Sequence, residues 1–418
     1  MKTNYFCLSL IFVIITTGCY KFDAASTSYH TKYQALKGML ESVYEDYTDQ
    51  YPEYPGGLVL KVIGGGEEYF LMAGVESTVT AQTHFRAASC TKTFTATAIL
   101  LLHQQGKLRI TDLITDTIPG TNQTYLPDGP GFDIPYKDRI TILDLLRHRA
   151  GVFDVANDSI PPTVSADVPY KELNYIYYIL DKEPEHTFHF DELIHVVAET
   201  GLSYFAPDSD YHYSNTGYSI LGKIIERVTG MSYKDFLEKH VLQPMGMYHS
   251  YMPVSGADQV IADPGINGFL LIENESYEIT TSNMSAFVAE GNMVTTPNDL
   301  SRFLRKLLSG KGILSYYTVN SLMMNCISTG TQKAGGYGCG LLYTNNLGYG
   351  HSGAQKGYLT FMACDPVADF TVVVYTNAWN LNEGMASLEY QITDLLQGIC
   401  YRSKSFSITS SESERQNK

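Results

Sequence analysis

Ser89 and Lys92 are the residues in this 418-residue chain whose types and spacing point most directly to chemistry. They form the chain's only Ser-x-x-Lys pair, at the start of the largely apolar stretch Phe85–Leu102. An apolar run of this length that stops near a glycine, here Gly106, predicts a buried helix. Residues three apart lie on one face of a helix, so the hydroxyl and the amine should adjoin.

This placement predicts a serine nucleophile that is activated by a lysine. Ser89 is expected in the first turn of the helix, where unpaired N–H groups favour a developing negative charge. Burial disfavours a charged ammonium, so Lys92 would be partly neutral and able to take the Ser89 proton. The alternative is an ordinary helix start, in which Ser89 caps the helix and Lys92 faces solvent.

A second segment, Tyr213–Asn215 (Tyr-Ser-Asn), precedes an amphipathic helical pattern. Its Tyr213 hydroxyl could pass a proton, and the Asn215 amide could hold Lys92 or a substrate carbonyl. The Tyr-x-Asn pattern itself recurs twice elsewhere in the chain, so only position and context favour this copy.

The third segment is Gly350–Ala354 (Gly-His-Ser-Gly-Ala), whose glycines permit close backbone approach. In one hypothesis it is a nucleophile elbow with Ser352 as the nucleophile. That arrangement needs a later histidine, and none follows His351. In the other, residues 351–353 form a strand that faces Ser89 and whose backbone helps to stabilise an oxyanion. An ordinary glycine-rich turn is the remaining interpretation.

Periodicity predicts the elements that must position these groups. We expect helices at 32–47, 85–102, 141–148, 216–228, 233–239, 296–309 and 383–396. We expect strands at 57–63, 69–74, 337–342, 358–363 and 370–376. Short helices separated by Pro-, Gly- and Asp-rich loops suggest a helical insertion over about 107–285. The sequence therefore predicts an α/β (α+β) fold: an antiparallel β-sheet flanked by helices, plus an all-helical subdomain.

The first 19 residues combine a basic start, an apolar run at Phe6–Ile15 and Cys19. The run is too short to span a bilayer and predicts a signal peptide. Small residues before Cys19 resemble a bacterial lipoprotein cleavage site, which would lipidate Cys19 and attach the protein to a membrane; ordinary cleavage near Gly18 or Ala24 is the alternative. Both predict export to the periplasm or cell envelope. We expect a tether at 20–33, a catalytic domain at 34–400 and a polar tail at 401–418.

Composition excludes several other classes of protein. A net charge of −15 without a basic stripe argues against a nucleic-acid partner. Without Cys7 and Cys19, five cysteines remain, an odd number with no CxxC, so neither a disulfide framework nor a zinc site of that kind is expected. His186, His189 and His195 match no zinc-protease spacing. We therefore expect no metal and no cofactor.

Taken together and in this order, Ser89-x-x-Lys92, Tyr213-x-Asn215 and His351-x-Gly353 resemble the serine β-lactamase-like, penicillin-recognising enzymes. The resemblance is closest to D-alanyl-D-alanine carboxypeptidases and class C β-lactamases, and it covers about residues 35–400. It implies a β-lactamase/transpeptidase-like fold and an acyl-enzyme formed on Ser89. It also implies the following roles: proton handling by Lys92 and Tyr213, substrate orientation by Asn215, a substrate strand at His351, Ser352 and Gly353, and an oxyanion hole from the backbone N–H groups of Ser89 and Ala354.

The sequence also departs from this family. His351 stands where most β-lactamases have lysine, as in carboxypeptidase-like and esterase members. Residues 341–350 contain no Lys or Arg, although carboxypeptidases of this type often carry an arginine there to bind the substrate carboxylate. Lys356, just beyond, could take its place. The absence of a Glu-x-x-Leu-Asn loop after the second motif speaks against a class A β-lactamase.

The leading hypothesis is an exported serine hydrolase of the D-alanyl-D-alanine carboxypeptidase or β-lactamase type. Its substrates would be peptidoglycan-type D-amino-acid peptides, β-lactams or small acyl compounds. An esterase or a D-aminopeptidase on the same scaffold is the closest alternative. A non-catalytic binding protein of the cell envelope is the alternative from a different class.

Overall fold

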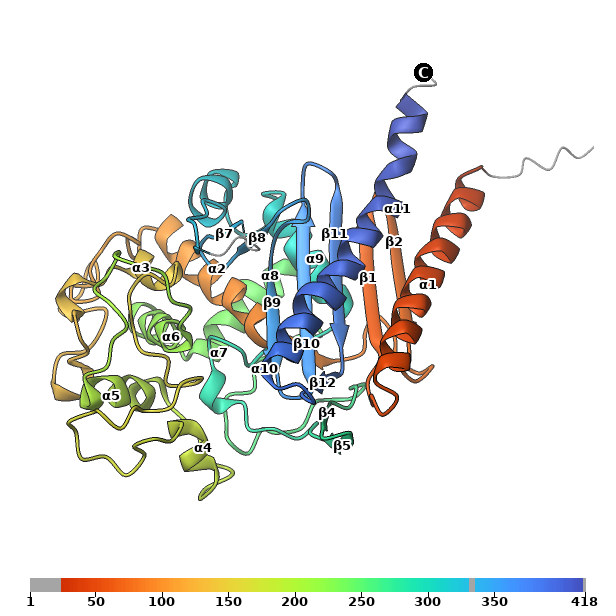
Figure 1. Ribbon diagram of the computed structural model, residues 1–418. Coiled ribbons are helices and arrows are strands. Elements are labelled where there is room, and N and C mark those ends of the chain that lie inside the picture. The colour runs from red at the N-terminus through yellow and green to blue at the C-terminus, as the bar shows by residue number, and fades with distance from the viewer. Residues whose placement is uncertain (1–23, 331–334, 416–418) are drawn as a thin grey trace, which may run out of the picture.

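The computed structural model describes residues 24–330 and 335–415. Its centre is a seven-stranded sheet in which every neighbouring pair is antiparallel (Figure 1). In spatial order the strands are β2 (Glu67–Ala73), β1 (Leu58–Gly64), β11 (Phe370–Thr376), β10 (Tyr358–Asp365), β9 (Gly348–Gln355), β8 (Leu342–Thr344) and β7 (Gly336–Tyr337).

The middle strands are continuous apolar runs because both faces of the sheet are covered. All seven residues of β1 and of β11 are buried, and Phe361 of β10 pairs with Val374 of β11. On its other side β10 pairs with β9, with Phe361 opposite Ser352. This register fixes the height of the Gly350–Ala354 segment relative to the helices that pack on the sheet.

Helices cover both faces. On one face, α1 (Ala24–Gln50) and α11 (Gln397–Arg415) lie side by side (Figure 1), together with α10 (Met385–Tyr390) and a π-helical segment, Gln391–Leu396. On the other face lie α2 (Thr91–Gln104) and α9 (Pro297–Leu308), with the Phe94 and Phe303 rings stacked at a centroid distance of 3.9 Å. The predicted buried helix is confirmed for Thr91–Leu102, which are all buried, but residues 85–90 form a short strand and a 3₁₀ turn instead.

A helical subdomain lies beside the sheet, on the left in Figure 1. It contains α3 (Ile142–Leu146), α4 (Tyr175–Leu180), α5 (Phe190–Thr200), α6 (Asn215–Thr229), α7 (Tyr233–Leu237), a π-helical turn (Glu238–Leu242) and α8 (Gln243–Met245). The insertion predicted at 107–285 is not helical to its end. β4 (Phe269–Ile272) and β5 (Glu275–Glu278) form a small sheet with β12 (Ala378–Asn380), and β3 (Phe85–Arg86) pairs with β6 (Val294–Thr295).

The mixed fold with an antiparallel sheet, flanking helices and a helical subdomain is confirmed. The expected strand at 337–342 is wrong, because the chain turns through residues 338–341 between β7 and β8. The predicted hairpin of 57–63 with 69–74 is confirmed as β1 and β2.

The tether expected at 20–33 is wrong from Ala24 onward, where α1 begins. The Tyr29 ring stacks on Tyr69 of β2 at 4.9 Å, and Lys32 Nζ lies 2.9 Å from Glu67 Oε2. The polar segment is therefore ordered by contacts with a strand about forty residues away, which local composition does not reveal. Residues 1–23, with the predicted signal peptide and Cys19, lie outside the described residues.

The polar segment expected from residue 401 begins inside α11, which extends to Arg415. Ser403 is fully buried and donates to the Ile399 carbonyl oxygen, and the Tyr401 hydroxyl donates to the Asn345 carbonyl oxygen. Within 24–330 and 335–415, no helix is both long enough and apolar enough to cross a membrane.

Candidate active site

Ser89 lies in a 3₁₀ turn, Ala88–Cys90, between β3 and α2. It therefore precedes α2 and does not occupy the first α-helical turn as expected. Ala88 has φ = 51°, a left-handed conformation that costs a non-glycine residue about 1–3 kcal/mol and interrupts the helix. The Thr91 hydroxyl holds this turn by donating to the Ala88 carbonyl oxygen at 2.7 Å. The half-buried Ser89 is thus presented on a strained turn at the start of a buried helix.

Lys92 is fully buried, as predicted, and its amine donates three hydrogen bonds. The acceptors are Ser89 Oγ at 3.4 Å, Asn215 Oδ1 at 2.6 Å and the Glu290 carbonyl oxygen at 2.9 Å. Burial lowers the pKa of Lys92 to about 8, although nearby carboxyl groups act in the opposite direction. Only about a tenth of Lys92 is therefore uncharged at pH 7, and about half at pH 8, next to the serine hydroxyl.

Tyr213 reaches the same serine from the helical subdomain. The Tyr213 and Ser89 side chains are close enough for Ser89 to lower the pKa of the tyrosine, and Lys92 Nζ lies 4.8 Å from the centre of the Tyr213 ring. Burial raises the pKa of Tyr213 well above its ordinary value, and the effect of Ser89 offsets this only in part. Tyr213 therefore keeps its proton at neutral pH.

The start of α6 places Asn215. Ser214 caps this helix, with the Gly217 N–H donating to Ser214 Oγ at 3.3 Å. One residue on, the Thr216 hydroxyl accepts from the Val155 N–H at 2.9 Å. The Asn215 backbone N–H lies close enough to the buried Asp154 carboxyl to lower the pKa of that group. These contacts tie the Tyr213–Asn215 segment to the loop after α3, and they explain why this copy of Tyr-x-Asn reaches Lys92.

The Gly350–Ala354 segment is a strand, as the second hypothesis for it expected. β8 pairs with β9 only as far as Gly350, so among the described residues this edge of β9 has no partner strand from His351 onward. That open edge passes the Ser89 turn closely: a Cβ on Gly353 would lie 2.4 Å from the Ala87 carbonyl oxygen. Cys90 Sγ also donates to the His351 carbonyl oxygen at 3.7 Å.

His351 is buried and uncharged. Its Nε2 lies 2.9 Å from the Tyr337 hydroxyl, and its Nδ1 lies 2.5 Å from the Ser352 carbonyl oxygen. Burial lowers the pKa of His351 to about 3, with the hydrogen bond to Ser352 acting against this effect. This position therefore supplies a neutral hydrogen-bonding ring, in place of the cation that a lysine would bring.

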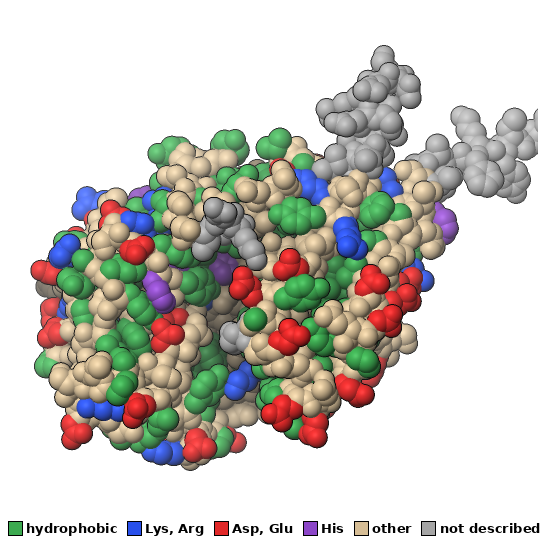
Figure 2. Space-filling model, in the orientation of Figure 1, with side chains coloured by type: hydrophobic (Ala, Val, Ile, Leu, Met, Phe, Trp, Pro, Cys, Tyr) green, Lys and Arg blue, Asp and Glu red, His purple; other side chains and the backbone are tan. Residues whose placement is uncertain are grey.

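The structure brings the three predicted segments together in a furrow between the sheet and the helical subdomain. Figure 2 shows the surface hollowed between these two halves, with a His side chain visible inside the hollow. The rings of Tyr213 and His351 have centroids 6.2 Å apart, which joins the second segment to the third. Lys92 joins the first to the second through Asn215.

His148 was missed by sequence reasoning. It is buried with φ = 58°, and its Nδ1 accepts from the Ser214 N–H at 3.1 Å. Its ring lies 4.2 Å from that of Tyr213, centroid to centroid, and its Nε2 has no hydrogen-bond partner. It fixes the backbone and ring next to the proton-carrying tyrosine. Its only sequence signal was its place in the stretch 140–151, which contributes to the family resemblance.

Two buried carboxyl groups near Lys92 were also missed. Glu290 Oε2 accepts from the Ser219 hydroxyl at 3.4 Å, and its Oε1 has no partner. Burial raises the pKa of Glu290 and of Asp154, while the nearby Lys92 amine acts in the opposite direction on both. Neither residue belongs to a recognisable spacing pattern, so only folding reveals that they surround the amine.

The histidines considered as metal ligands take part in other contacts. His186 bonds with Glu183 through Nδ1 and with Glu192 through Nε2, at 3.1 and 3.0 Å. Residues 24–330 and 335–415 contain no group of three or more His, Cys, Asp or Glu side chains arranged to hold a metal ion.

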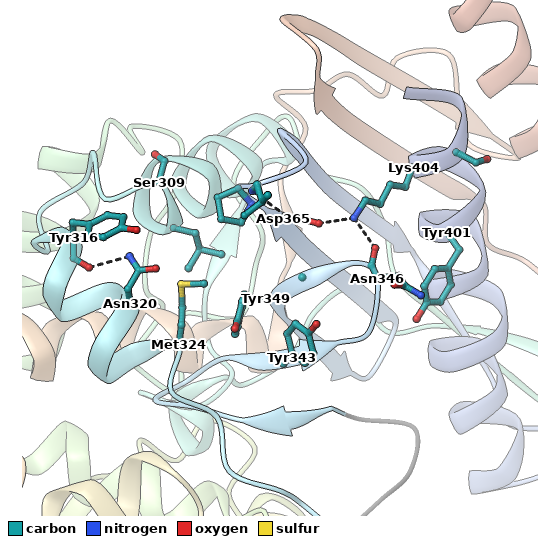
Figure 3. Close-up of a pocket in the computed structure, with 15 residues that line it drawn as sticks. Ser309, Tyr316, Asn320, Met324, Tyr343, Asn346, Tyr349, Asp365, Tyr401 and Lys404 are labelled. Atoms are coloured by element: carbon teal, nitrogen blue, oxygen red, sulfur yellow. Dashed lines mark hydrogen bonds and ion pairs between the residues drawn. The ribbon is translucent and has the colours of Figure 1, made fainter. Parts of the chain in front are cut away.

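A large cavity of about 950 Å³ lies away from this site, between α9, the β8–β9 hairpin and α11 (Figure 3). It is lined by tyrosines, including Tyr343 and Tyr349, and by the ion pair of Asp365 with Lys404 at 2.6 Å. The one lysine in this lining, Lys404, is held by the Asp365 carboxylate and also donates to the Asn346 carbonyl oxygen at 2.7 Å. None of the predicted site residues lines this cavity.

Comparisons with known proteins agree with this geometry. A family model described as Beta-lactamase matches residues 45–397. Penicillin-binding protein 4* of Bacillus subtilis is 26% identical over 291 residues, which are 66% of this chain but only 57% of that protein. Penicillin-binding protein 4 of Amycolatopsis lactamdurans is 25% identical over 360 residues, covering 82% of this chain and 86% of that protein.

Among solved structures, D-amino acid amidase from Ochrobactrum anthropi SV3, complexed with L-phenylalanine amide, has a TM-score of 0.69. It is 21% identical, and the match covers 91% of this chain and 99% of that one. This likeness supports the fold. The family model extends over most of the chain, including all three segments that meet at Ser89, and the chain belongs to the beta-lactamase family.

Proposed function

We propose that this protein is a serine hydrolase that forms an acyl-enzyme on Ser89. The observation that carries the proposal is the position of the buried Lys92 amine, 3.4 Å from Ser89 Oγ, with the Tyr213 side chain beside the same serine. A hydroxyl becomes an effective nucleophile when a base within hydrogen-bonding reach removes its proton. A buried amine with a pKa of about 8 is such a base.

The protonation states of Lys92 and Tyr213, the two neighbours of Ser89, give them different roles. Lys92 takes the serine proton as Oγ bonds to the substrate carbonyl carbon. Tyr213, which keeps its proton, donates it to the leaving nitrogen or oxygen as the scissile bond breaks, and recovers a proton from Lys92. In the second half, water attacks the acyl-enzyme and gives one proton to Lys92, and Lys92 passes a proton to Ser89 Oγ as the bond between the acyl carbon and Oγ breaks, which releases the acid and restores Ser89.

The remaining predicted residues bind and orient. The backbone N–H groups of Ser89 and Ala354 hold the oxyanion, where donors fixed before reaction are most effective. Asn215 fixes Lys92 through the 2.6 Å hydrogen bond. The open edge of β9 at His351, Ser352 and Gly353 aligns the substrate backbone, as an added strand would be aligned.

We propose D-amino-acid peptides of the D-alanyl-D-alanine type as the substrate class, with β-lactams acylating the same serine. Support comes from the penicillin-binding relatives in two bacteria and from the site's likeness to the carboxypeptidase branch. A second candidate is a D-amino acid amidase or aminopeptidase. It is favoured by the absence of Lys and Arg from residues 341–350 and by the fold shared with the Ochrobactrum anthropi amidase.

The test is covalent labelling of Ser89 by a penicillin and by a fluorophosphonate, located by peptide mass spectrometry. Both reagents should add their mass to the Ser89 peptide, and Ser89→Ala should abolish labelling and turnover. Comparing rates on a D-Ala-D-Ala peptide, a D-amino acid amide, a chromogenic cephalosporin and a short ester then ranks the substrate classes. Turnover by Ser89→Ala at the wild-type rate would point to a binding protein with contaminating activity.

We also propose export, with Cys19 as the lipidated residue. The proposal rests on the apolar run at Phe6–Ile15 and the small residues before Cys19. Radiolabelled fatty acid supplied to a bacterial host should enter the wild-type protein and not Cys19→Ala. Equal labelling of both proteins would contradict lipidation at this residue.

A further inference from the structure

Lys356 lies at the far end of the open strand edge, in the turn between β9 and β10. Its ammonium is 4.3 Å from the ring centroid of Tyr177, which is on α4 of the helical subdomain. Tyr177 is 49% exposed and Lys356 is partly exposed. The contact therefore joins the sheet to the helical subdomain across the furrow.

The turn itself is held in place. Gly357 has φ = 84°, and a Cβ there would lie 3.0 Å from the Gly268 Cα atom. The turn is thus packed against the segment that leads into β4. Lys356 starts from a fixed backbone, and only its side chain has freedom to adjust to a ligand.

The geometry of the site indicates which part of a substrate reaches Lys356. The leaving group must lie next to its proton donor, Tyr213, whose ring is near His351 at the start of the open edge. The oxyanion position is at Ala354. Lys356 is two residues further on, about 7 Å along an extended strand and away from Tyr213. It therefore lies beside the acyl portion of the substrate, on the opposite side of the scissile bond from the leaving group.

The charge on Lys356 is available to a ligand. Its ammonium packs against a neutral aromatic ring, and no ion pair with a carboxylate is present for it in the part of the chain that the structure describes. A cation–π contact holds an ammonium without neutralising it. Because the chain carries a net charge of −15, a local cation is needed to attract an anionic group to this surface.

We propose that Lys356 is a specificity-determining residue that binds a carboxylate on the acyl portion of the substrate, about two residues before the scissile carbonyl. This inference rests on the proposed acyl-enzyme function. In this role Lys356 favours substrates whose acyl chain carries an acidic side chain or ends in a carboxylic acid. It disfavours substrates with a positively charged amine at that distance, because like charges repel.

The experiment uses two esters with the same leaving group: p-nitrophenyl hydrogen adipate, whose acyl chain ends in a carboxylate, and its neutral methyl ester. The wild type should prefer the anionic ester by about tenfold in kcat/KM, the scale of one charge-assisted hydrogen bond near a surface. Lys356→Gln should reduce this ratio to about one, and Lys356→Glu should reverse it by a similar factor. Lys356→Arg should retain it.

Lys182→Gln is the matched control, because Lys182 also packs over a tyrosine ring, that of Tyr178, just after α4. It should keep the wild-type ratio. A wild-type ratio of one, or a preference that survives Lys356→Gln, overturns the proposal. Fluorophosphonate labelling of Ser89 and turnover of the neutral ester report on the hydrolase function separately. If both fail in the wild type, the proposed function fails and the specificity proposal fails with it.

Discussion

At the scale of single residues, the proton affinity of Lys92 is set by where the fold places it. Burial lowers its pKa to about 8, so below pH 8 the charged form dominates and the base is lost. We predict that kcat/KM for a neutral ester rises about tenfold per pH unit below pH 8 and levels off above it. A pH–rate profile from pH 5 to 9 measures this, and a rate independent of pH over that range would contradict the role of Lys92.

The Asn215 side chain allows a second test of the role of Lys92. Its Oδ1 accepts from Lys92 at 2.6 Å, a bond that favours the charged amine. In Asn215→Ala we expect the rise in kcat/KM to occur at lower pH than in the wild type, together with a lower maximum because Lys92 is less well held. An unshifted profile would show that Asn215 contacts the substrate only.

Substitution of Tyr213 can distinguish proton donation to the leaving group from activation of the Ser89 hydroxyl. An amide nitrogen must be protonated to leave, whereas p-nitrophenolate leaves without a proton. We expect Tyr213→Phe to lower amide hydrolysis at least about a hundredfold and p-nitrophenyl ester hydrolysis by less than about tenfold. Parallel assays on one enzyme preparation check this, and equal losses on both substrates would contradict a donor role for the hydroxyl.

At the scale of elements, the distance between β9 and the Ser89 turn is set by Gly353. A Cβ at this position would lie 2.4 Å from the Ala87 carbonyl oxygen, so Gly353→Ala must push the strand away from the turn. We expect at least about a hundredfold loss of kcat/KM, since a displacement of about 1 Å is enough to misplace reacting groups. Fluorescence-monitored unfolding should place the variant within a few degrees of the wild-type Tm.

Gly398 in α11 offers the matched control, because a Cβ there has open space around it and its φ is not positive. Gly398→Ala should leave activity unchanged and raise the free energy of unfolding by about 0.5–1 kcal/mol, since alanine loses less backbone entropy in a helix. A similar loss of activity in both variants would mean that the effect of Gly353→Ala is not local.

The individual elements also show which structural features can be predicted from the local sequence pattern. The limits of β11 and the buried face of α2 follow from apolar runs alone. Ser89 was expected inside that helix, but Ala88 is left-handed and the α-helix begins only at Thr91. The backbone at Ala88 is fixed by the Thr91 hydroxyl and by the pairing of the Ala87 N–H with the Met293 carbonyl oxygen. These interactions include a residue two hundred positions away, which no local pattern contains.

At the scale of the whole molecule, one face of the sheet carries the candidate active site and the other packs against the helices of the two chain ends. Ser89 belongs to the face with α2, and Ile399 of α11 is buried on the other face with α1. We predict that Ile399→Ala lowers the free energy of unfolding by about 2–4 kcal/mol. Well below its Tm it should keep kcat/KM within about twofold, because the sheet separates it from the furrow.

Denaturant unfolding and ester turnover on the same samples test this separation. Arg402→Ala, an exposed position on the same helix, is the control and should change the free energy of unfolding by no more than about 0.5 kcal/mol. A loss of activity in Ile399→Ala equal to that in Gly353→Ala would mean that the two faces are coupled.

The sequence by itself determined that Ser89 and Lys92 adjoin, since three residues at the start of a buried helix separate them by about one turn, and the family resemblance supplied their expected partners. Only the tertiary structure decided what surrounds Lys92, namely His148, Asp154 and Glu290, and which end of β9 leads to Lys356. It also turned both polar chain ends into packed helices. The physical reason is the same in each case: burial and charge–charge distance depend on surfaces contributed by remote parts of the chain, and local periodicity carries no information about them.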